Sequence, residues 1–447
     1  MRKRHVLVIL ELLQAFSFLF LFSKSQSQSL IGVNYGEVAD NLPPPSSTAT
    51  LLTSTSISKV RLYGTDATII SAFAGTNISL LVGVSDGDIP SLAASSSAAA
   101  AWVSANILPY MPATTIASIS VGNEVLNSGD DSLPSQLLPA MQNLLSVLSA
   151  NYPSIKISTV HSMAVLSQSD PPSAGAFHPD LAPNLDPILA FLQQGGSPFM
   201  INPYPWFAYN SDPRPETLAF CLFQSNPGRV DSGSGLTYMN MFDAQVDAVR
   251  AALDAKGFND VEIVIAETGW PYKGDSNEVG ATVENAQAYN GNLVTHLKSL
   301  AGTPRVPGKS VDTYLFALYD EDLKPGPTSE RSFGLYKTDL TENYDVGLSK
   351  AATNPSSLIP TPDQTQGNAS SSQPNKGETP TGWCLTAASS PGNGYVQPTS
   401  ACYTPNAVPS RKSGAHSSVS YFACMIFHVA LLRFGIGRKV QAVDELA

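Results

Sequence analysis

Short apolar segments recur along the first 350 residues of the chain, and longer segments of mixed polarity separate them. The apolar segments have the length of β-strands, and several of the segments between them have helical spacing. The expected strands lie at 31–35, 59–63, 79–84, 116–121, 156–160, 199–202, 261–266 and 312–318, and examples of expected helices lie at 92–106, 133–150 and 240–256. Such strand–helix alternation over roughly 320 residues predicts an α/β fold, a (β/α)8 TIM barrel. An open doubly wound sheet is the alternative, but no glycine-rich phosphate loop follows the first strand.

The predicted strand at 261–266 is largely apolar on both faces and ends on an acid. Glu267 follows it directly, and a Thr-Gly turn then leads to Trp270. A carboxylate at the end of a buried strand is unfavourable unless it has partners or a task. An aromatic ring beside a carboxylate is typical of a sugar site, because a pyranose has an apolar face and a polar rim. The alternative is an ordinary strand-end acid beside a tryptophan that packs in the core.

A second acid ends another predicted strand. The segment 116–121 runs into Gly122, Asn123 and Glu124. Hydrolysis of a glycosidic bond needs two carboxyl groups, one that donates a proton and one that attacks the sugar or activates water. The chemistry of a (β/α)8 barrel lies at the carboxyl ends of its strands, where both glutamates are expected. The pair therefore favours a glycoside hydrolase over a simple structural role for either acid.

Together with these acids, several motifs give the chain a resemblance to plant glycoside hydrolase family 17, the endo-1,3-β-glucanases and their relatives. The resemblance covers residues 31 to about 350. Its motifs are Ile-Gly-Val-Asn-Tyr-Gly at 31–36, Val-Arg-Leu-Tyr at 60–63, Val-Gly-Asn-Glu at 121–124, Asn-Pro-Tyr-Pro at 202–205, Glu-Thr-Gly-Trp-Pro at 267–271 and Glu-Arg-Ser-Phe-Gly-Leu-Tyr at 330–336. One such motif would be weak, but their number and order make the resemblance specific.

The resemblance implies a retaining endo-β-1,3-glucanase that needs no metal or organic cofactor. It implies that Glu124 is the general acid/base and that Glu267 is the nucleophile. It also implies that Asn123 forms a hydrogen bond with the sugar 2-hydroxyl. It also implies supporting roles for three residues that follow the last strand, in which a lysine among carboxylates lowers their pKa values and orients them. These residues are Glu321, Lys324 and Glu330.

Four aromatic residues lie close together after the predicted strand at 199–202. Tyr204, Trp206, Phe207 and Tyr209 predict a wall on which sugar rings stack, and the alternative is that half of them pack beneath the loop. Of the four, Tyr204 is expected to line the substrate cleft. The complete set of expected substrate-binding residues is Asn123, Tyr63, Tyr204, Trp270, Glu321, Lys324 and Glu330.

Composition narrows the possible partners. The net charge of −11 disfavours nucleic acid, because phosphate binding requires a basic face. A neutral polysaccharide such as β-1,3-glucan needs no charge complement. The 4 cysteines and 6 histidines show no metal-binding spacing. Cys221 is expected to be a buried, inert thiol, and the protein is expected to be a monomer.

The N-terminus has the pattern of a secretory signal. A basic start at residues 1–5 precedes an apolar segment at 6–22, and small and polar residues follow. The pattern predicts a signal peptide at 1–28 and therefore a secreted protein of the extracellular space or cell wall. An uncleaved signal anchor is the alternative, which the polar interruptions and the short apolar span disfavour. Secretion makes candidate glycan sites of Asn77-Ile78-Ser79 and Asn368-Ala369-Ser370.

The composition changes after the catalytic barrel, which is expected at 29–352. A linker rich in Pro and Ser, expected to be disordered, occupies 353–381. Trp383-Cys384 resembles the opening of a carbohydrate-binding module that many relatives carry, but the rest of 382–447 departs from it, and a Cys384–Cys402 disulfide stays an open alternative. Small residues before an apolar stretch at 419–434 suggest a GPI anchor at the plasma membrane. A soluble secreted form and an aberrant C-terminus are the alternatives.

Two rival functions share most of these features. A glucanase for mixed 1,3;1,4-linked chains or a glucanosyltransferase would use the same two glutamates with differently shaped subsites. A non-catalytic glucan-binding protein of the cell wall is a rival from another class. Loss of either glutamate would have favoured this second rival, and both Glu124 and Glu267 are present.

Overall fold

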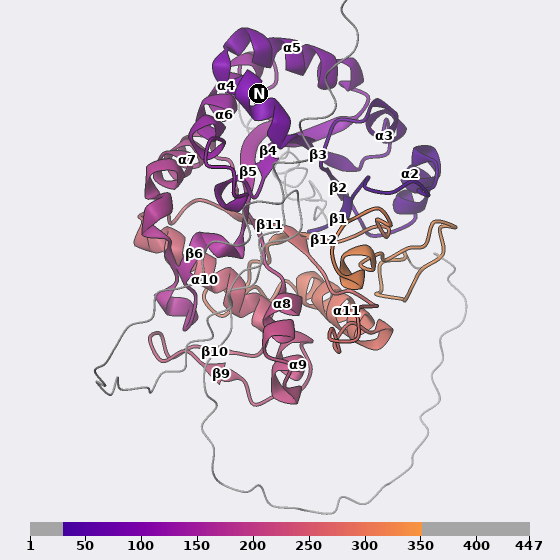
Figure 1. Ribbon diagram of the computed structural model, residues 1–447, viewed down its shortest axis with the longest axis vertical. Coiled ribbons are helices and arrows are strands. Elements are labelled where there is room, and N and C mark those ends of the chain that lie inside the picture. Colours follow the sequence, from indigo (N-terminus) through magenta and orange to yellow (C-terminus); the bar gives the residue numbers. More distant parts are fainter. Residues whose placement is uncertain (1–29, 351–447) are drawn as a thin grey trace, which may run out of the picture. The chain divides into compact units, whose positions relative to one another are not determined.

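Eight parallel strands close into a barrel in the order β1-β2-β3-β4-β5-β8-β11-β12, and helices surround it (Figure 1). The strands are β1 (Ile31–Tyr35), β2 (Lys59–Leu62), β3 (Ser79–Val84), β4 (Thr115–Asn123), β5 (Lys156–Ser162), β8 (Phe199–Asn202), β11 (Ile263–Thr268) and β12 (Asp312–Leu315). Every neighbouring pair is parallel, including β1 with β12, which closes the barrel. The predicted (β/α)8 barrel is confirmed, and each of its strands overlaps a predicted one.

The computed structural model describes residues 30–350. The expected signal peptide at 1–28, the linker at 353–381 and the segment 382–447 lie outside the described residues. So do the Asn368 sequon, the proposed Cys384–Cys402 pair and the apolar stretch at 419–434. Within the described range no helix is long and apolar enough to cross a membrane.

Helices form the outer layer of the barrel. They are α2 (Pro45–Thr53), α3 (Ala67–Ala72), α4 (Ile89–Ala94), α5 (Ser96–Asn106), α6 (Pro134–Leu148), α7 (Ala182–Gly195), α8 (Pro205–Ser211), α9 (Pro215–Cys221), α10 (Met241–Ala255) and α11 (Val283–Ser299). Single 3-10 turns occupy Asp86–Asp88, Leu108–Tyr110, Val125–Asn127, Met163–Val165, Pro172–Ala174, Pro179–Leu181 and Thr328–Arg331. Two small hairpins complete the described elements: β6 (Leu166–Gln168) with β7 (Ala176–Phe177), and β9 (Arg229–Val230) with β10 (Thr237–Tyr238).

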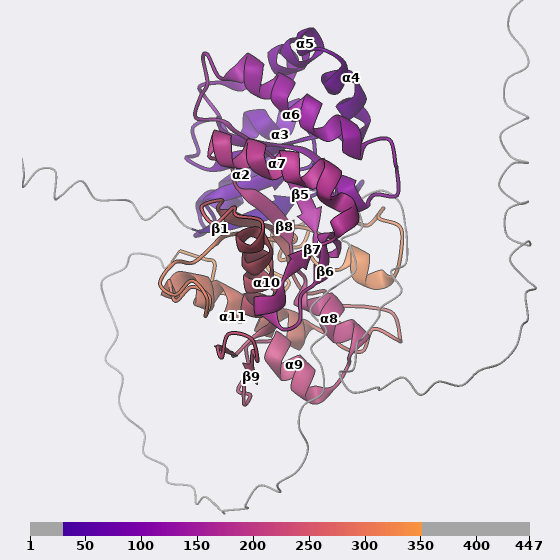
Figure 2. The same cartoon turned by 90° about the vertical axis from the view of Figure 1, so that its left-hand side faces the viewer.

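The single helix expected at 92–106 is two helices, α4 and α5. Ser95 separates them because its backbone is extended, with φ −162° and ψ 148°, and its side chain accepts a hydrogen bond from the amide of Ala98. A serine that caps a helix in this way satisfies a donor that the first turn leaves open. Both helices pack against α6 on one flank of the barrel (Figure 1, Figure 2).

Apolar side chains fill two regions, one between strands and helices and one inside the barrel. Leu80 and Val82 of β3 belong to the large cluster that includes the helices. Leu81 lies between them and belongs to a separate small cluster. Because successive side chains of a strand point to opposite faces, the small cluster fills the barrel interior. Its members are Leu81, Val160, Met200, Ala266 and Tyr314.

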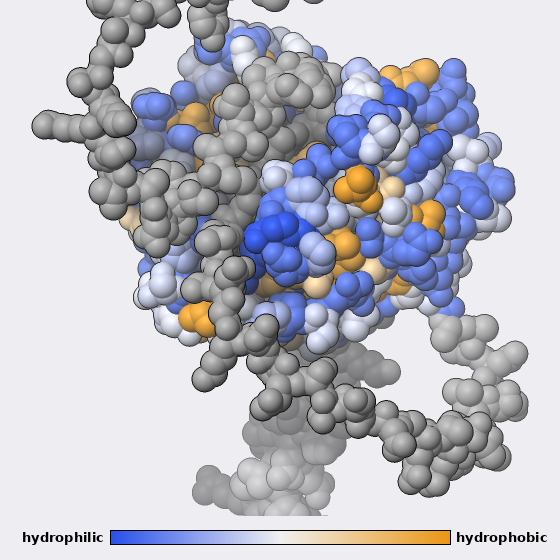
Figure 3. Space-filling model, turned by 60° about the horizontal axis from the view of Figure 1, so that its bottom comes forward, coloured by the Kyte–Doolittle hydropathy of each residue, from blue (hydrophilic) through white to orange (hydrophobic). Residues whose placement is uncertain are grey.

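The surface carries few large apolar side chains, and on the face seen in Figure 3 they form separate spots among hydrophilic residues. Cys221 is fully buried in α9, as expected. Asn77 is exposed directly before β3, at the amino end of the barrel. Its glycosylation remains a prediction.

Candidate active site

Glu124 and Glu267 both lie at the carboxyl-end rim of the barrel. Glu124 directly follows β4, and Glu267 is the penultimate residue of β11. The strands β5 and β8 separate β4 from β11, so the two acids stand on different sides of the rim. Both are buried, with exposed fractions of 4% and 1%. Buried carboxyl groups require partners, and the partners of the two acids differ in kind.

A local distortion at the end of β4 places Glu124. The pairing of β4 with β5 shifts register between Ser120 and Asn123, and Gly122 has a φ of +67°. A Cβ at Gly122 would lie 2.4 Å from Cγ2 of Val125, so a side chain there would collide. Glu124 itself is left-handed, with φ 57° and ψ 28°, and its amide donates to the carbonyl of Val160 at 2.9 Å. Such a bulge re-aims a side chain at the end of a strand.

Arg61 of β2 is the charged partner of Glu267. Its guanidinium donates to Oε1 of Glu267 at 2.8 Å and to the carbonyl of Ala266 at 3.1 Å. A second nitrogen donates to Oδ1 of Asn123 at 2.7 Å. Arg61 has an exposed fraction of 1%, so this ion pair is shielded from solvent. One cation therefore neutralises Glu267 and also holds the residue before Glu124.

Two tyrosines complete the surroundings of Glu267. The hydroxyl of Tyr63 donates to Oε1 at 2.8 Å, and the hydroxyl of Tyr204 donates to Oε2 at 2.9 Å. Burial, and then the charge of Glu267, raises the pKa of Tyr63 well above its usual value. Tyr63 therefore stays protonated and remains a donor. Both tyrosines were expected to contact substrate, and in the structure both contact the carboxylate.

Asn202, the last residue of β8, contacts Glu124. Its Nδ2 donates to Oε1 of Glu124 at 2.7 Å, and Asn202 has an exposed fraction of 3%. This partner is neutral, in contrast to the guanidinium beside Glu267. Both glutamates are thus held by hydrogen bonds, and Glu267 also has the arginine Arg61 against its carboxylate.

The loop after β12 contributes the expected lysine and glutamate pair. Nζ of Lys324 lies 2.8 Å from Oε2 of Glu321 and 4.4 Å above the ring of Phe316. The amide of Val38 donates to Oε1 of Glu321 at 3.1 Å. A Cβ at Gly36 would lie 2.2 Å from the carboxyl carbon of Glu321, so only glycine fits beside this group. Glu321 therefore joins the loop after β1 to the loop after β12, and Lys324 pairs with it.

Glu330 is another buried carboxyl group near Glu267 and Glu321, with an exposed fraction of 7%. Burial raises its pKa to about 7, although the charge of Lys324 acts in the opposite direction. The charges of Glu278, Glu267 and Glu321 raise this pKa further. Oε2 of Glu330 has no hydrogen-bond partner among the described residues. The charged form of Glu330 is therefore unfavourable at neutral pH.

Trp270 lies in the core and has no exposed surface. Its Nε1 donates to the carbonyl of Gly280 at 2.9 Å, and its ring packs against Trp206, with 5.3 Å between ring centroids, and against Tyr209 at 5.7 Å. The position does not support the expected direct contact of Trp270 with a sugar. Burial of these large rings in one aromatic cluster stabilises the loops that follow β8 and β11.

The remaining aromatic residues of the expected wall also pack inward. Trp206 is fully buried, and Tyr209 has an exposed fraction of 6%. Phe207 is half-buried, with its ring centroid 5.3 Å from that of Tyr204. The alternative that these rings pack beneath the loop therefore describes Trp206 and Tyr209.

The sequence interpretation did not identify Arg61 and Asn202 as site residues. Both lie in motifs that the resemblance uses, and Arg61 also stands in a short apolar strand. A charged residue there is costly without a partner, so this position was a usable signal. Asn202 gave no comparable signal, because an asparagine before proline is common in loops.

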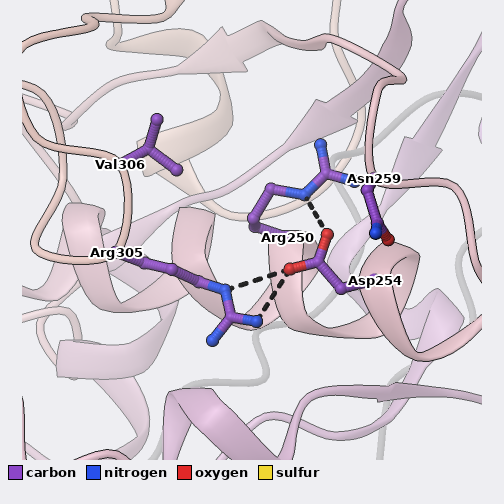
Figure 4. A pocket seen from close by; sticks show the side chains of 5 residues that line it. All are labelled: Arg250, Asp254, Asn259, Arg305 and Val306. Carbon is purple, nitrogen blue, oxygen red and sulfur yellow. Dashed lines mark hydrogen bonds and ion pairs between the residues drawn. The ribbon is translucent and has the colours of Figure 1, made fainter.

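A surface pocket elsewhere in the barrel has a structural explanation (Figure 4). Its lining residues are Arg250, Asp254, Asn259, Arg305 and Val306. Nε of Arg250 donates to Asp254 at 2.9 Å, and Arg305 donates to the other carboxylate oxygen at 2.7 Å. The pocket lies between α10 and the loops that precede β11 and β12, at the end of the barrel opposite the glutamates. Its ion pairs tie these loops to α10.

Two buried carboxyl groups at the carboxyl end of a (β/α)8 barrel are the arrangement on which glycoside hydrolases depend. Residues 31–348 match the family model described as glycosyl hydrolases family 17. The chain therefore belongs to this family and is a glycoside hydrolase.

Relatives and solved structures agree with this assignment. The chain is 56% identical over 423 residues to glucan endo-1,3-beta-glucosidase 7 of Arabidopsis thaliana, which covers 91% of this chain and 80% of the relative. It is 52% identical over 399 residues to a glucan endo-1,3-beta-D-glucosidase of Olea europaea, covering 88% and 87%. Among solved structures, a beta-1,3-glucanase and allergen of Cryptomeria japonica pollen is 43% identical, with a TM-score of 0.68 over 71% of this chain and 99% of that chain.

Proposed function

We propose that the protein hydrolyses internal 1,3-β-glucosidic linkages of β-1,3-glucan with retention of configuration. The observation that carries the proposal is the contrast between the two buried carboxyl groups, with an arginine against Glu267 and a neutral amide against Glu124. The names of the relatives that are 56% and 52% identical support the choice of a 1,3-β-linked glucan.

In this mechanism Glu267 is the nucleophile. It attacks the anomeric carbon as a carboxylate, and Arg61 and the two tyrosine hydroxyls hold its oxygens in place. These groups neutralise a charge that would otherwise be costly inside the protein. The same hydrogen-bond donors also fix the orientation in which the carboxylate attacks the sugar to form the covalent intermediate.

Glu124 is the general acid and then the general base. It protonates the leaving oxygen as the glycosidic bond breaks, and afterwards it removes a proton from the attacking water. Asn123 assists at the sugar 2-hydroxyl. Since its Oδ1 accepts from Arg61, its Nδ2 is the group that donates to this hydroxyl.

The test is the stereochemistry and identity of the first products. NMR of products from laminarin is expected to show a β-anomer first, and the chain-length profile is expected to show oligosaccharides from internal cleavage. An initial α-anomer would contradict the retaining mechanism and with it the nucleophilic role of Glu267. The carboxyl groups are expected to lie roughly 5–5.5 Å apart, as in retaining enzymes.

Linkage preference requires a separate comparison. One solved structure that is 35% identical, with a TM-score of 0.66 over 71% of this chain, comes from a study of two plant beta-glucan endohydrolases with distinct substrate specificities. The same fold therefore accommodates more than one specificity. Hydrolysis of laminarin at a much higher rate than mixed 1,3;1,4-linked glucan is the result that supports the proposal. Products longer than the substrate would instead indicate a glucanosyltransferase.

We also propose that the protein is secreted to the cell wall, with GPI attachment at the plasma membrane as the form to test. The support is the sequence pattern at 1–28 and at 419–434. N-terminal sequencing of the protein from plant tissue is expected to begin near residue 29. Release from membranes by a phosphatidylinositol-specific phospholipase would support the anchor, and its failure would favour the soluble form.

A further inference from the structure

Asn202 occupies a position from which it can act on the proton of Glu124. It is the last residue of β8, two positions after Met200, whose side chain lies in the cluster that fills the barrel interior. Because side chains alternate along a strand, Asn202 points to the same inner face, at the carboxyl-end rim. The two residues whose side chains meet there are separated by 78 positions in the sequence.

The contact distinguishes the two oxygens of Glu124. Nδ2 of Asn202 donates to Oε1 at 2.7 Å. In a protonated carboxyl group the carbonyl oxygen is the better acceptor, so this hydrogen bond favours Oε1 as the carbonyl oxygen and Oε2 as the oxygen that carries the proton. An amide does not titrate in the working range, and its N–H group is present whether Glu124 is protonated or ionised.

The orientation of the amide has a clear chemical reason. The reverse orientation would place Oδ1 of Asn202 against a carboxylate oxygen, and two acceptors repel each other. Oδ1 is instead turned away and has no hydrogen-bond partner among the described residues. A buried acceptor without a partner is unfavourable. The observed orientation of Asn202 accepts this unfavourable term and keeps the hydrogen bond from Nδ2 to Glu124.

We propose that Asn202 is a positioning residue that keeps the transferable proton of Glu124 on Oε2 and holds that oxygen toward the glycosidic bond. The inference rests on the proposed role of Glu124. In the first step the proton on Oε2 moves to the leaving oxygen while Glu267 forms its bond to the anomeric carbon. In the second step Oε2 takes a proton from water, the water oxygen bonds to that carbon, and the bond to Glu267 breaks.

The test compares two substrates in the variant Asn202→Leu, which keeps a similar volume and removes the donor. On laminarin, kcat is expected to fall about 100-fold while KM changes by less than about twofold, because proton transfer alone is impaired. On a 2,4-dinitrophenyl β-laminaribioside the glycosylation rate, followed as the burst of dinitrophenolate, is expected to stay within about twofold, since this leaving group needs no protonation. An equal loss on both substrates, or no loss on either, would overturn the inference.

Asn290→Ala is the matched control. Asn290 of α11 is also fully buried, its Nδ2 donates to the hydroxyl of Tyr344 at 3.1 Å, and its Oδ1 lacks a partner among the described residues. It shares the contact pattern of Asn202 without a contact to Glu124. Loss of stability is expected in Asn290→Ala, with the ratio of the two rates unchanged. If the ratio changed as in Asn202→Leu, the effect would be structural and the inference would fail.

Two further variants keep the outcomes distinguishable. Asn202→Ala removes the donor with a smaller side chain, and the same selective loss is expected of it if Asn202→Leu does not fold. Glu124→Ala tests the proposed function independently. Selective loss on laminarin in Glu124→Ala without selective loss in the Asn202 variants would overturn only the role of Asn202. Absence of selective loss in Glu124→Ala would overturn the proposed role of Glu124.

Discussion

The surroundings of Glu267 and Glu124 differ although both carboxyl groups are buried at one rim of the same barrel. Arg61, Tyr63 and Tyr204 donate to Glu267, so charge and hydrogen bonds act together on it. Glu124 is contacted by the neutral amide of Asn202. The same residue type can serve as nucleophile or as acid, and its environment decides between these roles. The difference matches the proposed roles and shows that the partners of each acid depend on which strands the barrel brings to the same rim.

The largest effect is expected from loss of the group beside the arginine. Glu267→Ala is expected to lower kcat on laminarin by at least about 10⁴-fold, because no group remains to form the glycosyl-enzyme. Azide is expected to restore part of the activity and to yield an α-configured glycosyl azide, identified by NMR. A β-configured product would show that the roles of the two glutamates are exchanged.

The effect of removing Glu124, the acid beside the amide of Asn202, is expected to depend on the leaving group of the substrate. Glu124→Ala is expected to lower kcat on laminarin by about 10²–10⁴-fold, the usual contribution of general acid catalysis. An activated aryl glycoside is expected to glycosylate the enzyme at nearly the normal rate. Azide is then expected to give the β-configured product, because it attacks the covalent intermediate from the opposite side.

Replacement of Arg61 measures what its positive charge contributes to the difference between the surroundings of Glu267 and Glu124. Arg61→Met is expected to lower the free energy of unfolding by about 3–5 kcal/mol, because Glu267 would remain buried without the positive charge of Arg61. Urea denaturation measures this change. Lys59→Met on the same strand is the control: its partner Asp312 is 34% exposed, so a loss of about 1 kcal/mol is expected. Equal losses in the two variants would contradict the importance of burial at Arg61.

Glu330 is the rival proton donor, and its replacement sharpens the assignment of Glu124. Burial raises the pKa of Glu330 to about 7, so below this pH it is mainly protonated and Glu330→Gln imitates its neutral form. This variant is expected to keep kcat at pH 5 within about tenfold. It is also expected to lose less stability as the pH rises from about 4.5, the ordinary pKa of glutamate, to about 7, because over this range the unfolded wild-type chain has released this proton while the native protein still holds it. If Glu330→Gln lost formation of the glycosyl-enzyme while Glu124→Ala kept nearly wild-type activity, Glu330 would be the proton donor.

The smallest effect is expected at His161, which follows Val160, the residue whose carbonyl accepts a hydrogen bond from the amide of Glu124. His161 stacks on Phe199 at 4.7 Å between ring centroids, and neither ring nitrogen has a hydrogen-bond partner among the described residues. Burial lowers its pKa to about 3. The unfolded chain binds a proton below about 6.5, the usual pKa of histidine, and the native protein does not, so stability falls as the pH drops from about 6.5 toward 3.

His161→Phe is expected to reduce this loss of stability in acid, measured by thermal unfolding between pH 7 and pH 4. The variant separates acid unfolding from the titration of the catalytic groups, which would otherwise both lower activity at low pH. His296, which is bonded to Asp243 at 2.9 Å, is the contrasting control. Burial lowers the pKa of His296, but the hydrogen bond to Asp243 and the charge of Asp243 together outweigh burial and raise it, so the contribution of His296 to stability is lost as the pH rises. The prediction would be contradicted if the stability of His161→Phe fell with decreasing pH as much as that of the wild type.

Strand positions were predictable, but their ends were not. The apolar segments at 79–84 and 199–202 coincide with β3 and β8. The strand expected at 116–121 extends through Asn123 because pairing with β5 resumes after a bulge. The strand expected at 312–318 ends at Leu315. Polar residues at a strand end look like loop in the sequence, and only the partner strand shows whether hydrogen bonding continues.

By itself the sequence determined the barrel and the two acids, because periodic apolar segments and short motifs are local properties of the chain. The tertiary structure decided which groups meet them. Arg61 and Glu267 are 206 positions apart and form their ion pair only because barrel closure brings β2 and β11 to one rim. The structure also decided that Trp270 packs in the core, since the burial of a ring depends on neighbours such as Trp206 that local patterns do not place. Contacts of this kind depend on the geometry of the closed barrel, which no single segment of the chain contains.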